Sequence, residues 1–415
     1  MSLRLPRHRA TTAQLAGLYP FVASAALPVS PVVLGLDRLG DSGVFRFDPF
    51  SLYRAGTLTN PNLVVFGEPG AGKSTAVKTL CLRLAASQPT YLAVIDPKGE
   101  YAPLADALGL TVVRLCPGGQ VRLNPLSRNG ADGDHARRVA LLQGLLAIVM
   151  RRDPTAVEEA ALTWVVDELD QRDGPEPTLA DVACLLTDPS PSMVERARRS
   201  TADLAAELDP MRLACGRMVE RDLAGMFEGR STVAADPDGP GVVLDLSALH
   251  HDPQALALVM AAGAAWLQSA LGAPPGTAYR RRVQVLDEAW ALLASERTAR
   301  YLQACFKLCR AWGVANIAVS HRISDLSAQA DDGTATAKIA AGLLADTQTR
   351  VVFRQSSDQA PHARTLLGLT DTQAKLLPSL GRGCALWVVA GRAHLVEHVL
   401  DAGDVVLCDT DGALR

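Results

Sequence analysis

Short apolar runs alternate with longer amphipathic segments along most of the chain. The run Leu63–Phe66 precedes a glycine-rich turn, after which Lys73–Ala86 repeats its apolar residues with the period of an α-helix. Further short apolar runs predict strands at Tyr91–Ile95, Thr111–Leu115, Val242–Asp245, Val283–Leu286, Ala315–Ser320 and Val351–Phe353. Helical patterns such as Pro253–Leu271 and Ala299–Trp312 lie between several of them. This alternation predicts an α/β fold whose mostly parallel sheet is covered by helices on both faces.

Residues 132–236 depart from this alternation. Helical patterns such as Val139–Met150 and Ala156–Leu169 follow one another there, separated by proline and glycine breaks. We therefore expect an all-helical insertion domain, with the α/β core formed by residues 61–131 and 237–415.

The two ends of the chain predict the margins of the sheet. Within residues 1–60, a short apolar lead-in precedes the alternating segments Val32–Leu36 and Val44–Phe47, which predict strands at a sheet edge. Near the other end, Ala385–Val389 and His394–Val399 predict an antiparallel hairpin joined by Gly391 and Arg392.

Composition supports a folded protein with a sizeable core, because 48% of its 415 residues are hydrophobic and 20% are charged. The formal net charge of -3 excludes a surface coated with basic groups, so any nucleic-acid contact has to be local, in a pore or groove. The eight cysteines form no CxxC pair, which favours reduced thiols. Cys305 and Cys309 share a helical face, where core packing is favoured over a zinc site.

Three arginines, Arg4, Arg7 and Arg9, precede the apolar stretch Leu15–Leu27 and give the start of the chain a likeness to a secretory signal. Tyr19-Pro20 interrupts that stretch, however, and no other segment reaches the ~18 uninterrupted apolar residues of a membrane span. We expect a cytoplasmic chain that neither spans a membrane nor carries its own anchor.

The segment from Gly67 to Thr75 fits the Walker A pattern and stands where that pattern has mechanical meaning, after a strand and at the start of a helix. Its glycines let successive N–H groups turn toward phosphates, and the helix N-terminus adds its positive dipole end. The residues expected to bind ATP are Gly67, Gly70, Ala71, Gly72, Lys73, Ser74 and Thr75. Lys73 is expected to reach the β and γ oxygens, Ser74 to bind Mg²⁺ through its hydroxyl, and Thr75 to contact the α-phosphate.

An acidic pair, Asp287 and Glu288, follows the predicted strand Val283–Leu286 and supplies the second half of such a site. Asp287 is expected to hold the Mg²⁺ shell, and Glu288 to act as general base on the attacking water. An acidic pair after a strand is usually a solvated helix start, but an upstream Walker A segment reverses that preference. The sequence thus predicts a Mg²⁺-dependent ATPase.

A third polar position is His321, which follows the predicted strand Val314–Ser320 and is a candidate sensor of the γ-phosphate or an ordinary surface histidine. Four arginines were considered as fingers that complete a neighbouring subunit's site: Arg310, Arg322, Arg350 and Arg354. Arg310 is preferred, and at least two of the four are expected to be ordinary helix-end or surface arginines.

The octapeptide Val94–Tyr101, which reads VIDPKGEY, resembles the signature of the ATPases that energise conjugative type IV secretion, a group in the HerA/FtsK branch of P-loop motors. Other segments that fit this family are Leu123–Leu126, Met226–Gly229, Val243–Leu246, Leu286–Trp290 and Phe353–Gln355. The lead-in Leu15–Phe21 and the phrase Thr57–Asn62 look most like actinobacterial members. The resemblance covers roughly residues 40–400 and implies a RecA-like core, and Arg310 matches the family's trans-arginine position, eleven residues before the sensor.

Two departures from the family pattern change what is expected. Members commonly carry a long N-terminal domain that docks on the secretion channel, whereas only about sixty residues precede this core, so docking would need another surface or another protein. The family's sensor strand usually ends in Gln, where this chain has His321. Asp96 is expected to end a strand beside the phosphate-loop strand and to support that loop or its waters, while Lys98 and Glu100 are left open as subunit-interface charges.

Three functions remain open. The leading one is a homo-hexameric ATPase motor that energises DNA or protein transfer, held by channel components at the inner face of the cell membrane. A second is a DNA-pumping coupling protein, for which Arg280–Arg282 is the only basic run near the core, although a solvated strand start is the favoured interpretation of that run. A third is an assembly switch that binds ATP and hydrolyses it slowly, against which the intact Glu288 argues.

Overall fold

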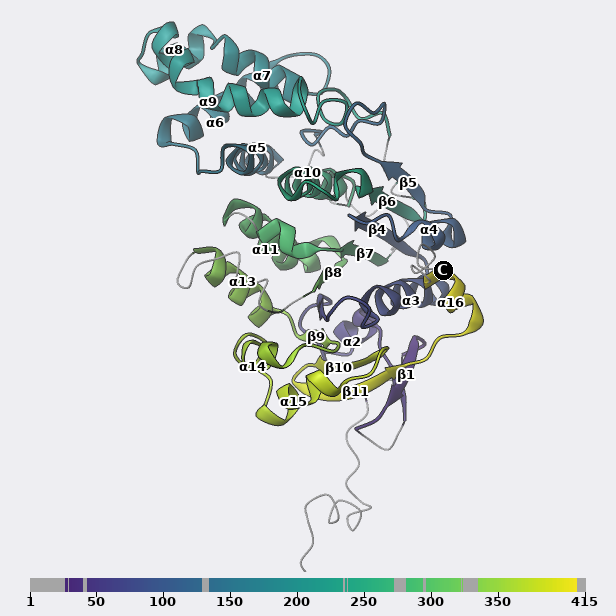
Figure 1. Ribbon diagram of the computed structural model, residues 1–415. Coiled ribbons are helices and arrows are strands. Elements are labelled where there is room, and N and C mark those ends of the chain that lie inside the picture. Colours follow the sequence, from purple (N-terminus) through teal and green to yellow (C-terminus); the bar gives the residue numbers. More distant parts are fainter. Residues whose placement is uncertain are drawn as a thin grey trace, which may run out of the picture.

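Eleven strands in the described part of the chain form one mixed sheet, in the order β2-β1-β11-β10-β9-β3-β8-β7-β4-β6-β5 (Figure 1). The computed structural model describes residues 27–28, 30–39, 43–128, 134–233, 236, 238–271, 281–293, 296–321, 323 and 335–408. The strands are β1 Val33–Asp37, β2 Val44–Arg46, β3 Leu63–Phe66, β4 Thr90–Asp96, β5 Thr111–Arg114, β6 Gly241–Asp245, β7 Arg281–Leu286, β8 Val314–Ser320, β9 Thr349–Val352, β10 Cys384–Val389 and β11 Arg392–His398.

The strands from β9 to β5 in this order pair in parallel, and those from β2 to β9 pair antiparallel. Strand β3 explains why the parallel part is buried on both faces. Its residues Val64 and Phe66 pack into one hydrophobic cluster, while Leu63 and Val65 pack into another on the opposite face. Because every side chain of the strand is covered, the sequence has a continuous apolar run there instead of an alternation.

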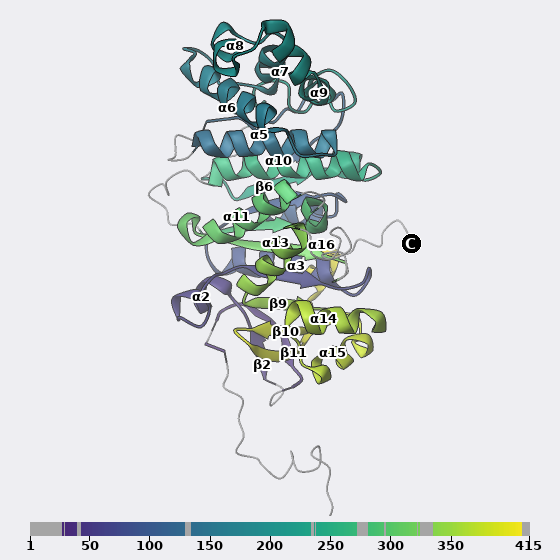
Figure 2. The same ribbon diagram turned by 90° about the vertical axis from the view of Figure 1, so that its left-hand side faces the viewer.

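Helices cover both faces of the sheet (Figures 1 and 2). Helices α3 Lys73–Ser87, α4 Ala102–Leu108 and α16 Ala402–Cys408 lie together on one face, and α10 Pro253–Leu271, α11 Glu296–Trp312 and α13 Ala335–Asp346 lie on the other. The remaining short elements are α2 Pro49–Arg54, α14 Ala360–Leu367, α15 Asp371–Leu376, η1 Ser247–Leu249, η2 Ala289–Leu293, η3 Ser357–Gln359 and η4 Leu377–Ser379. The predicted α/β fold with a mostly parallel sheet is confirmed.

Five helices follow one another between β5 and β6, at the top of Figure 1: α5 Asp134–Met150, α6 Ala156–Gln171, α7 Leu179–Thr187, α8 Pro191–Ala197 and α9 Thr201–Val219. Helix α5 packs against α10 and α11 of the α/β core. One hydrophobic cluster therefore continues from the sheet through α10 and α5 to α9. The domain boundaries predicted from the sequence stay a prediction, and the helical segment shares its core with the sheet.

Two family-like segments meet where the chain leaves the core for these helices and where it returns. The backbone N–H of Leu123 donates to the carbonyl of Met226 at 2.8 Å, and Arg122 forms an ion pair with Glu228 at 2.8 Å. Asn124, which is fully buried, donates through its side chain to the carbonyl of Pro177 at 2.9 Å. These segments hold the base of the helical region together, which gives them a structural role.

The strands and the hairpin predicted at the edge of the sheet are confirmed, whereas the strand predicted to lie beside β3 is wrong. Strands β1 and β2 lie at the sheet edge, and β10 and β11 form the expected hairpin, although its turn is Ala390-Gly391, with φ of 49° and 79°. The strand that ends in Asp96 does not lie beside β3, because β8 and β7 lie between them. The lead-in before residue 27, with its arginines and its signal-like stretch, lies outside the described residues.

The basic run Arg280–Arg282 overlaps the start of β7, and its Arg281 is neither solvated nor open to DNA. That guanidinium is 9% exposed, pairs with the buried carboxylate of Asp48 at 2.8 Å and stacks over the ring of Phe50. Arg280 lies outside the described residues. Cys305 and Cys309 are buried as expected. Among the described helices, none has the length and apolar character to cross a membrane.

Candidate active site

Four neighbouring parallel strands end at the same edge of the sheet. Phe66 at the end of β3 pairs with Ser320 at the end of β8, and Leu286 at the end of β7 pairs with both Ala318 of β8 and Ile95 of β4. The residues that follow these strands are therefore brought together at one edge, although they are up to 254 positions apart in sequence (67 and 321). Open α/β sheets bind ligands at this carboxyl edge.

The loop between β3 and α3 is held by backbone hydrogen bonds on several sides. The N–H of Gly67 donates to the carbonyl of His321 at 3.2 Å, and the N–H of Glu68 donates to that of Arg354 at 3.0 Å. Gly72 has a φ of 106°, which residues with a Cβ rarely adopt. A Cβ on Gly67 would lie 2.5 Å from Cβ of Phe353. Glycine at these two positions is thus required by the loop's shape.

Lys73 begins α3 and turns back over this loop. Its ammonium group lies 2.5 Å from the carbonyl oxygen of Gly67, 3.1 Å from that of Glu68 and 3.1 Å from Nδ1 of His321. These contacts use the three donors of the group. Burial lowers the pKa of Lys73 to about 8, with a further lowering from the charge of Lys98. The site thus holds a desolvated cation on a glycine-rich loop at the N-terminus of a helix, an arrangement suited to phosphate.

Asp287 follows β7 and is 3% exposed. Its Oδ1 accepts the N–H of Glu288 at 3.0 Å, while Oδ2 is buried without a hydrogen-bond partner among the described residues. Burial raises the pKa of Asp287 to about 6, and the neighbouring charge of Glu288 adds to this. A buried carboxylate oxygen with no donor is suited to a cation. The single carboxylate oxygen fits Mg²⁺, which takes one or two protein carboxylates and keeps waters and phosphate oxygens as its other ligands. Within the described residues no group of three acidic, histidine or cysteine side chains could hold a metal.

Glu288 lies next to Asp287 with a backbone φ of 52°, a conformation that costs about 1–3 kcal/mol in a non-glycine residue. Oxygen Oε1 forms ion pairs with Lys98 and, at 2.6 Å, with Nε2 of His321. The indole N–H of Trp290 donates to Oε2 at 2.5 Å. Burial works to raise the pKa of Glu288, but the hydrogen bond and charge of His321 and the charge of Lys98 outweigh it and lower the pKa to about 2.

The contacts of His321 define its tautomer when the ring is neutral. An ammonium group can only donate, so the Nδ1 atom next to Lys73 has to accept. The ring proton then lies on Nε2, the nitrogen that is 2.6 Å from Oε1 of Glu288. The structure therefore places His321 between Lys73 and Glu288, two residues that the sequence analysis assigned to one site, and joins them through the imidazole.

Asp96 holds the Asp96–Tyr101 segment in a turn through its two carboxylate oxygens. Asp96 is 1% exposed; its Oδ1 accepts the N–H of Lys98 at 3.2 Å, and its Oδ2 accepts the N–H of Tyr101 at 2.8 Å. This turn directs Lys98 to Glu288, so Lys98 is part of the site, which sequence reasoning missed. Asp96 thus supports its own turn, whereas its position in the sequence suggested support for the phosphate loop or its waters. Glu100 is half-buried, and the structure gives it no defined role.

The candidate arginines fall into different environments. Arg310 is exposed at the end of α11, at the start of β8, so about 20 Å of strand separates it from His321 in the same chain. Arg350 donates to three backbone carbonyls, those of Thr347, Leu367 and Leu344, which assigns it to fold support. Arg354 lies 3.4 Å from Glu68 of the phosphate loop, and Arg322 lies outside the described residues.

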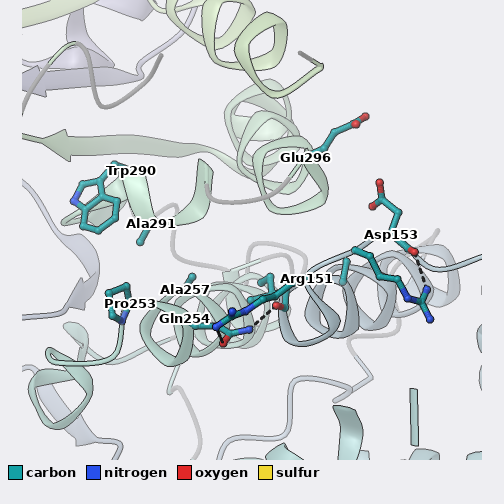
Figure 3. A pocket seen from close by; sticks show the side chains of 11 residues that line it. Arg151, Asp153, Pro253, Gln254, Ala257, Trp290, Ala291 and Glu296 are labelled. Carbon is teal, nitrogen blue, oxygen red and sulfur yellow. Dashed lines mark hydrogen bonds between the residues drawn. The ribbon is translucent and has the colours of Figure 1, made fainter. Parts of the chain in front are cut away.

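A cavity of about 430 Å³ lies behind Trp290, between η2 on one side and the ends of α5 and α10 on the other (Figure 3). Arg151, with a φ of 55°, donates to Gln254 at 3.3 Å on the wall opposite Trp290. Gln254 in turn donates to the carbonyl of Ile148 at 2.7 Å. Trp290 thus borders this cavity and also contacts Glu288.

A buried strand, a glycine turn and a helix, with an acidic pair at the end of a nearby parallel strand, give the chain a RecA-like fold and an arrangement similar to that of P-loop NTPases. Residues 57–174 match the family model described as the central domain of the helicase HerA. No curated protein matches the sequence.

Two solved structures share the fold over most of the chain. VirB4 of Thermoanaerobacter pseudethanolicus is 23% identical with a TM-score of 0.74, and the match covers 92% of this chain and 100% of that one. The plasmid coupling protein TrwB, in complex with ADP and Mg²⁺, is 15% identical with a TM-score of 0.57, and the match covers 82% of this chain and 86% of that one. The chain is thus similar to the conjugative members of the HerA/FtsK branch, as its motifs predicted.

Proposed function

We propose that the chain is a Mg²⁺-dependent ATPase motor that energises transfer of DNA or protein through a conjugative type IV secretion-like system. One observation carries the ATPase assignment: Lys73 and Glu288 reach the same sheet edge and are joined through His321, which lies 3.1 Å from one and 2.6 Å from the other. The likeness to VirB4 and to the conjugative coupling protein TrwB supports the transfer role.

Each residue then has a chemical role. Gly67, Gly70, Ala71 and Gly72 form the loop that encloses the phosphates, with Thr75 contacting the α-phosphate. The phosphate loop performs these roles, while side chains around it handle charge and proton transfer.

Lys73 neutralises the β and γ oxygens. Ser74 and Asp287 would hold Mg²⁺, and the bound ion would supply positive charge that stabilises the phosphates as negative charge develops on them. Glu288 orients the attacking water and accepts its proton, and His321 aligns Glu288 with the γ-phosphate.

The exposed position of Arg310 supports a site completed between subunits. The residue is too far from His321 to act within its own chain, so it serves a neighbour's nucleotide in a ring, for which we propose a homo-hexamer. Such a ring would work in the cytoplasm at the inner face of the membrane, held there by channel proteins.

A DNA-pumping coupling protein is the second candidate. The match to the central domain of the helicase HerA favours it. The basic run at Arg281 gives it no support, because that guanidinium is buried against Asp48.

The test combines hydrolysis with mass measurement. Phosphate release and particle mass would be measured with ATP and Mg²⁺, with and without single- and double-stranded DNA, for wild type, Lys73→Ala and the exposed-lysine control Lys375→Ala. We expect a ring that hydrolyses ATP, no hydrolysis by Lys73→Ala and wild-type behaviour of the control. Hydrolysis by Lys73→Ala at the wild-type rate would refute the site; salt-sensitive stimulation by DNA would favour the pump.

A further inference from the structure

We infer that Lys98 is a positioning residue that pairs with Glu288 while the phosphate site is free and moves to the terminal phosphate when a nucleoside triphosphate binds. The catalytic carboxylate would then be released only by a triphosphate and not by a diphosphate. This inference rests on the proposed ATPase function and adds a regulatory step at the same site.

The fold holds the backbone of Lys98, while its side chain reaches partly into solvent. Asp96 holds the turn through both carboxylate oxygens, at 3.2 Å from the N–H of Lys98 and 2.8 Å from that of Tyr101. The Lys98 side chain is 25% exposed, whereas that of Glu288 is 7% exposed. The ammonium group can therefore change partners without any change in the fold, and the carboxylate cannot follow it into solvent.

Among the described residues, Glu288 is the one that forms an ion pair with Lys98, and the charges of Asp287 and Glu100 attract it less. Lys98 Nζ also lies 3.2 Å from Nε2 of His321, but that nitrogen carries the ring proton. The contact is between two donors and gives no hydrogen bond. A second anion near Lys98 would compete with Glu288 alone, without breaking a bond to His321.

While Lys98 pairs with Glu288, nitrogen atoms lie close to most of the acceptor positions of the Glu288 carboxylate. Lys98 and His321 face Oε1, and Trp290 donates to Oε2 at 2.5 Å. A carboxylate has about four acceptor positions, and three nitrogen atoms lie close to those of Glu288. Departure of Lys98 leaves Oε1 with one free acceptor position for a water, while His321 and Trp290 keep the group in place.

Two ammonium groups flank the imidazole, Lys73 at 3.1 Å from Nδ1 and Lys98 at 3.2 Å from Nε2. Their nitrogen atoms thus lie within about 9 Å of each other, a span close to that of one phosphate group with two N–H···O contacts of about 2.8 Å. The terminal phosphate of a nucleoside triphosphate adjoins the phosphates cradled by Lys73 and supplies the anion. A diphosphate has no group at this position.

The test is equilibrium binding of the non-hydrolysable ATP analogue ADPNP and of ADP, each with Mg²⁺, by calorimetry. We expect Lys98→Met to weaken ADPNP at least tenfold and ADP less than twofold, and Lys98→Arg to restore most of the ADPNP affinity. Lys375→Met, on an exposed lysine of α15, is the matched control and should behave as wild type. Equal losses for both nucleotides, or no loss for either, would overturn the inference.

A double-mutant cycle isolates the resting ion pair. Glu288→Gln removes the competing charge, so it should tighten ADPNP about fivefold or more while leaving ADP unchanged. In a chain that also carries Lys98→Met, Glu288→Gln should not tighten ADPNP binding. An equal tightening there would refute the pairing of Lys98 with Glu288. The two proposals fail separately: a wild type that binds nucleotide but never hydrolyses it refutes the ATPase, whereas equal dependence of ADP and ADPNP on Lys98 refutes only its role.

Discussion

The Nε2 atom of His321 lies 2.6 Å from Oε1 of Glu288, and the other ring nitrogen lies 3.1 Å from the ammonium group of Lys73. A neutral imidazole thus accepts from one of these residues and donates to the other. A glutamine side chain can do the same, because its amide oxygen accepts and its NH₂ group donates. The family's usual residue and the histidine of this chain are therefore chemically equivalent at this position.

The first prediction follows from that equivalence. His321→Gln should keep kcat for ATP hydrolysis within about threefold of wild type, whereas His321→Ala should lower it about 10- to 100-fold by leaving Glu288 misplaced. Steady-state phosphate release measures both. An alanine variant as active as the glutamine variant would show that the link between Lys73 and Glu288 does not matter.

Glu288→Gln should lower kcat by about 10²- to 10⁴-fold, the contribution of a positioned general base, while ADP affinity stays unchanged. Glutamine preserves the size and one acceptor of the side chain but cannot take a proton from water. Single-turnover hydrolysis and ADP calorimetry separate the two effects. Loss of ADP binding together with turnover would indicate collapse of the site and contradict the assigned role.

Arg310→Ala should lower hydrolysis by about 10³-fold or more without changing the melting temperature, because the side chain is exposed and proposed to act on a neighbour. Arg350→Ala is the contrasting variant. It removes donors to the carbonyls of Leu367 at 2.6 Å and Leu344 at 3.0 Å, so its melting temperature should fall.

Mixing inactive subunits tests the shared site directly. Arg310→Ala subunits have an intact Lys73, and Lys73→Ala subunits have an intact Arg310, so mixed rings should contain some complete sites. We expect the mixture to recover hydrolysis that neither variant shows alone. No recovery, in rings shown by mass to be mixed, would argue against a finger in trans.

Stability should fall in mild acid because of His398. Burial lowers the pKa of its imidazole from 6.5 to about 4; Nδ1 contacts the carbonyl of Gly383 at 2.8 Å, and Nε2 is buried without a hydrogen-bond partner among the described residues. The unfolded chain takes up a proton near pH 6.5 and the folded chain only near pH 4. The neutral ring therefore contributes stability above pH 6.5, and up to about 3 kcal/mol of it is lost as the pH falls to 4.

Urea unfolding at pH 7 and pH 4.5 checks this dependence. His398→Asn keeps a donor for Gly383 and does not titrate, so it should lose less stability than wild type between the two pH values. His362→Asn, at an exposed histidine of α14, is the control and should follow wild type. An equal loss of unfolding free energy between pH 7 and pH 4.5 in wild type and His398→Asn would contradict the assignment of this loss to His398.

The pair of Arg83 and Asp404 fastens helix α16 to α3, the helix that begins with Lys73. The two side chains are 2.5 Å apart, and that of Asp404 is 2% exposed. Asp404→Asn should lower the free energy of unfolding by about 2 kcal/mol, the contribution of a hydrogen bond to a charged group. Glu397→Gln breaks the exposed pair with Arg38 and should change it by less than about 1 kcal/mol. If urea unfolding showed that Asp404→Asn and Glu397→Gln lower the free energy of unfolding by similar amounts, burial would not set the strength of the two pairs.

The sequence by itself determined the local parts of this protein. The apolar run Leu63–Phe66, the glycines that follow and the helical period from Lys73 predicted the phosphate loop, because a glycine turn between a buried strand and a helix depends on neighbouring residues only. The order of strands and helices predicted the class of fold, because each of these elements is also specified by the pattern of neighbouring residues.

Only the tertiary structure decided how distant residues meet. Strand order put β8 and β7 between β3 and β4, which no local pattern specifies, and so brought Lys98 to Glu288 instead of to the phosphate loop. It also buried Arg281 against Asp48, 233 positions away, where a basic run by itself suggested solvent or DNA. Charges at strand ends acquire their partners from sheet order, and sheet order is set by packing over the whole chain.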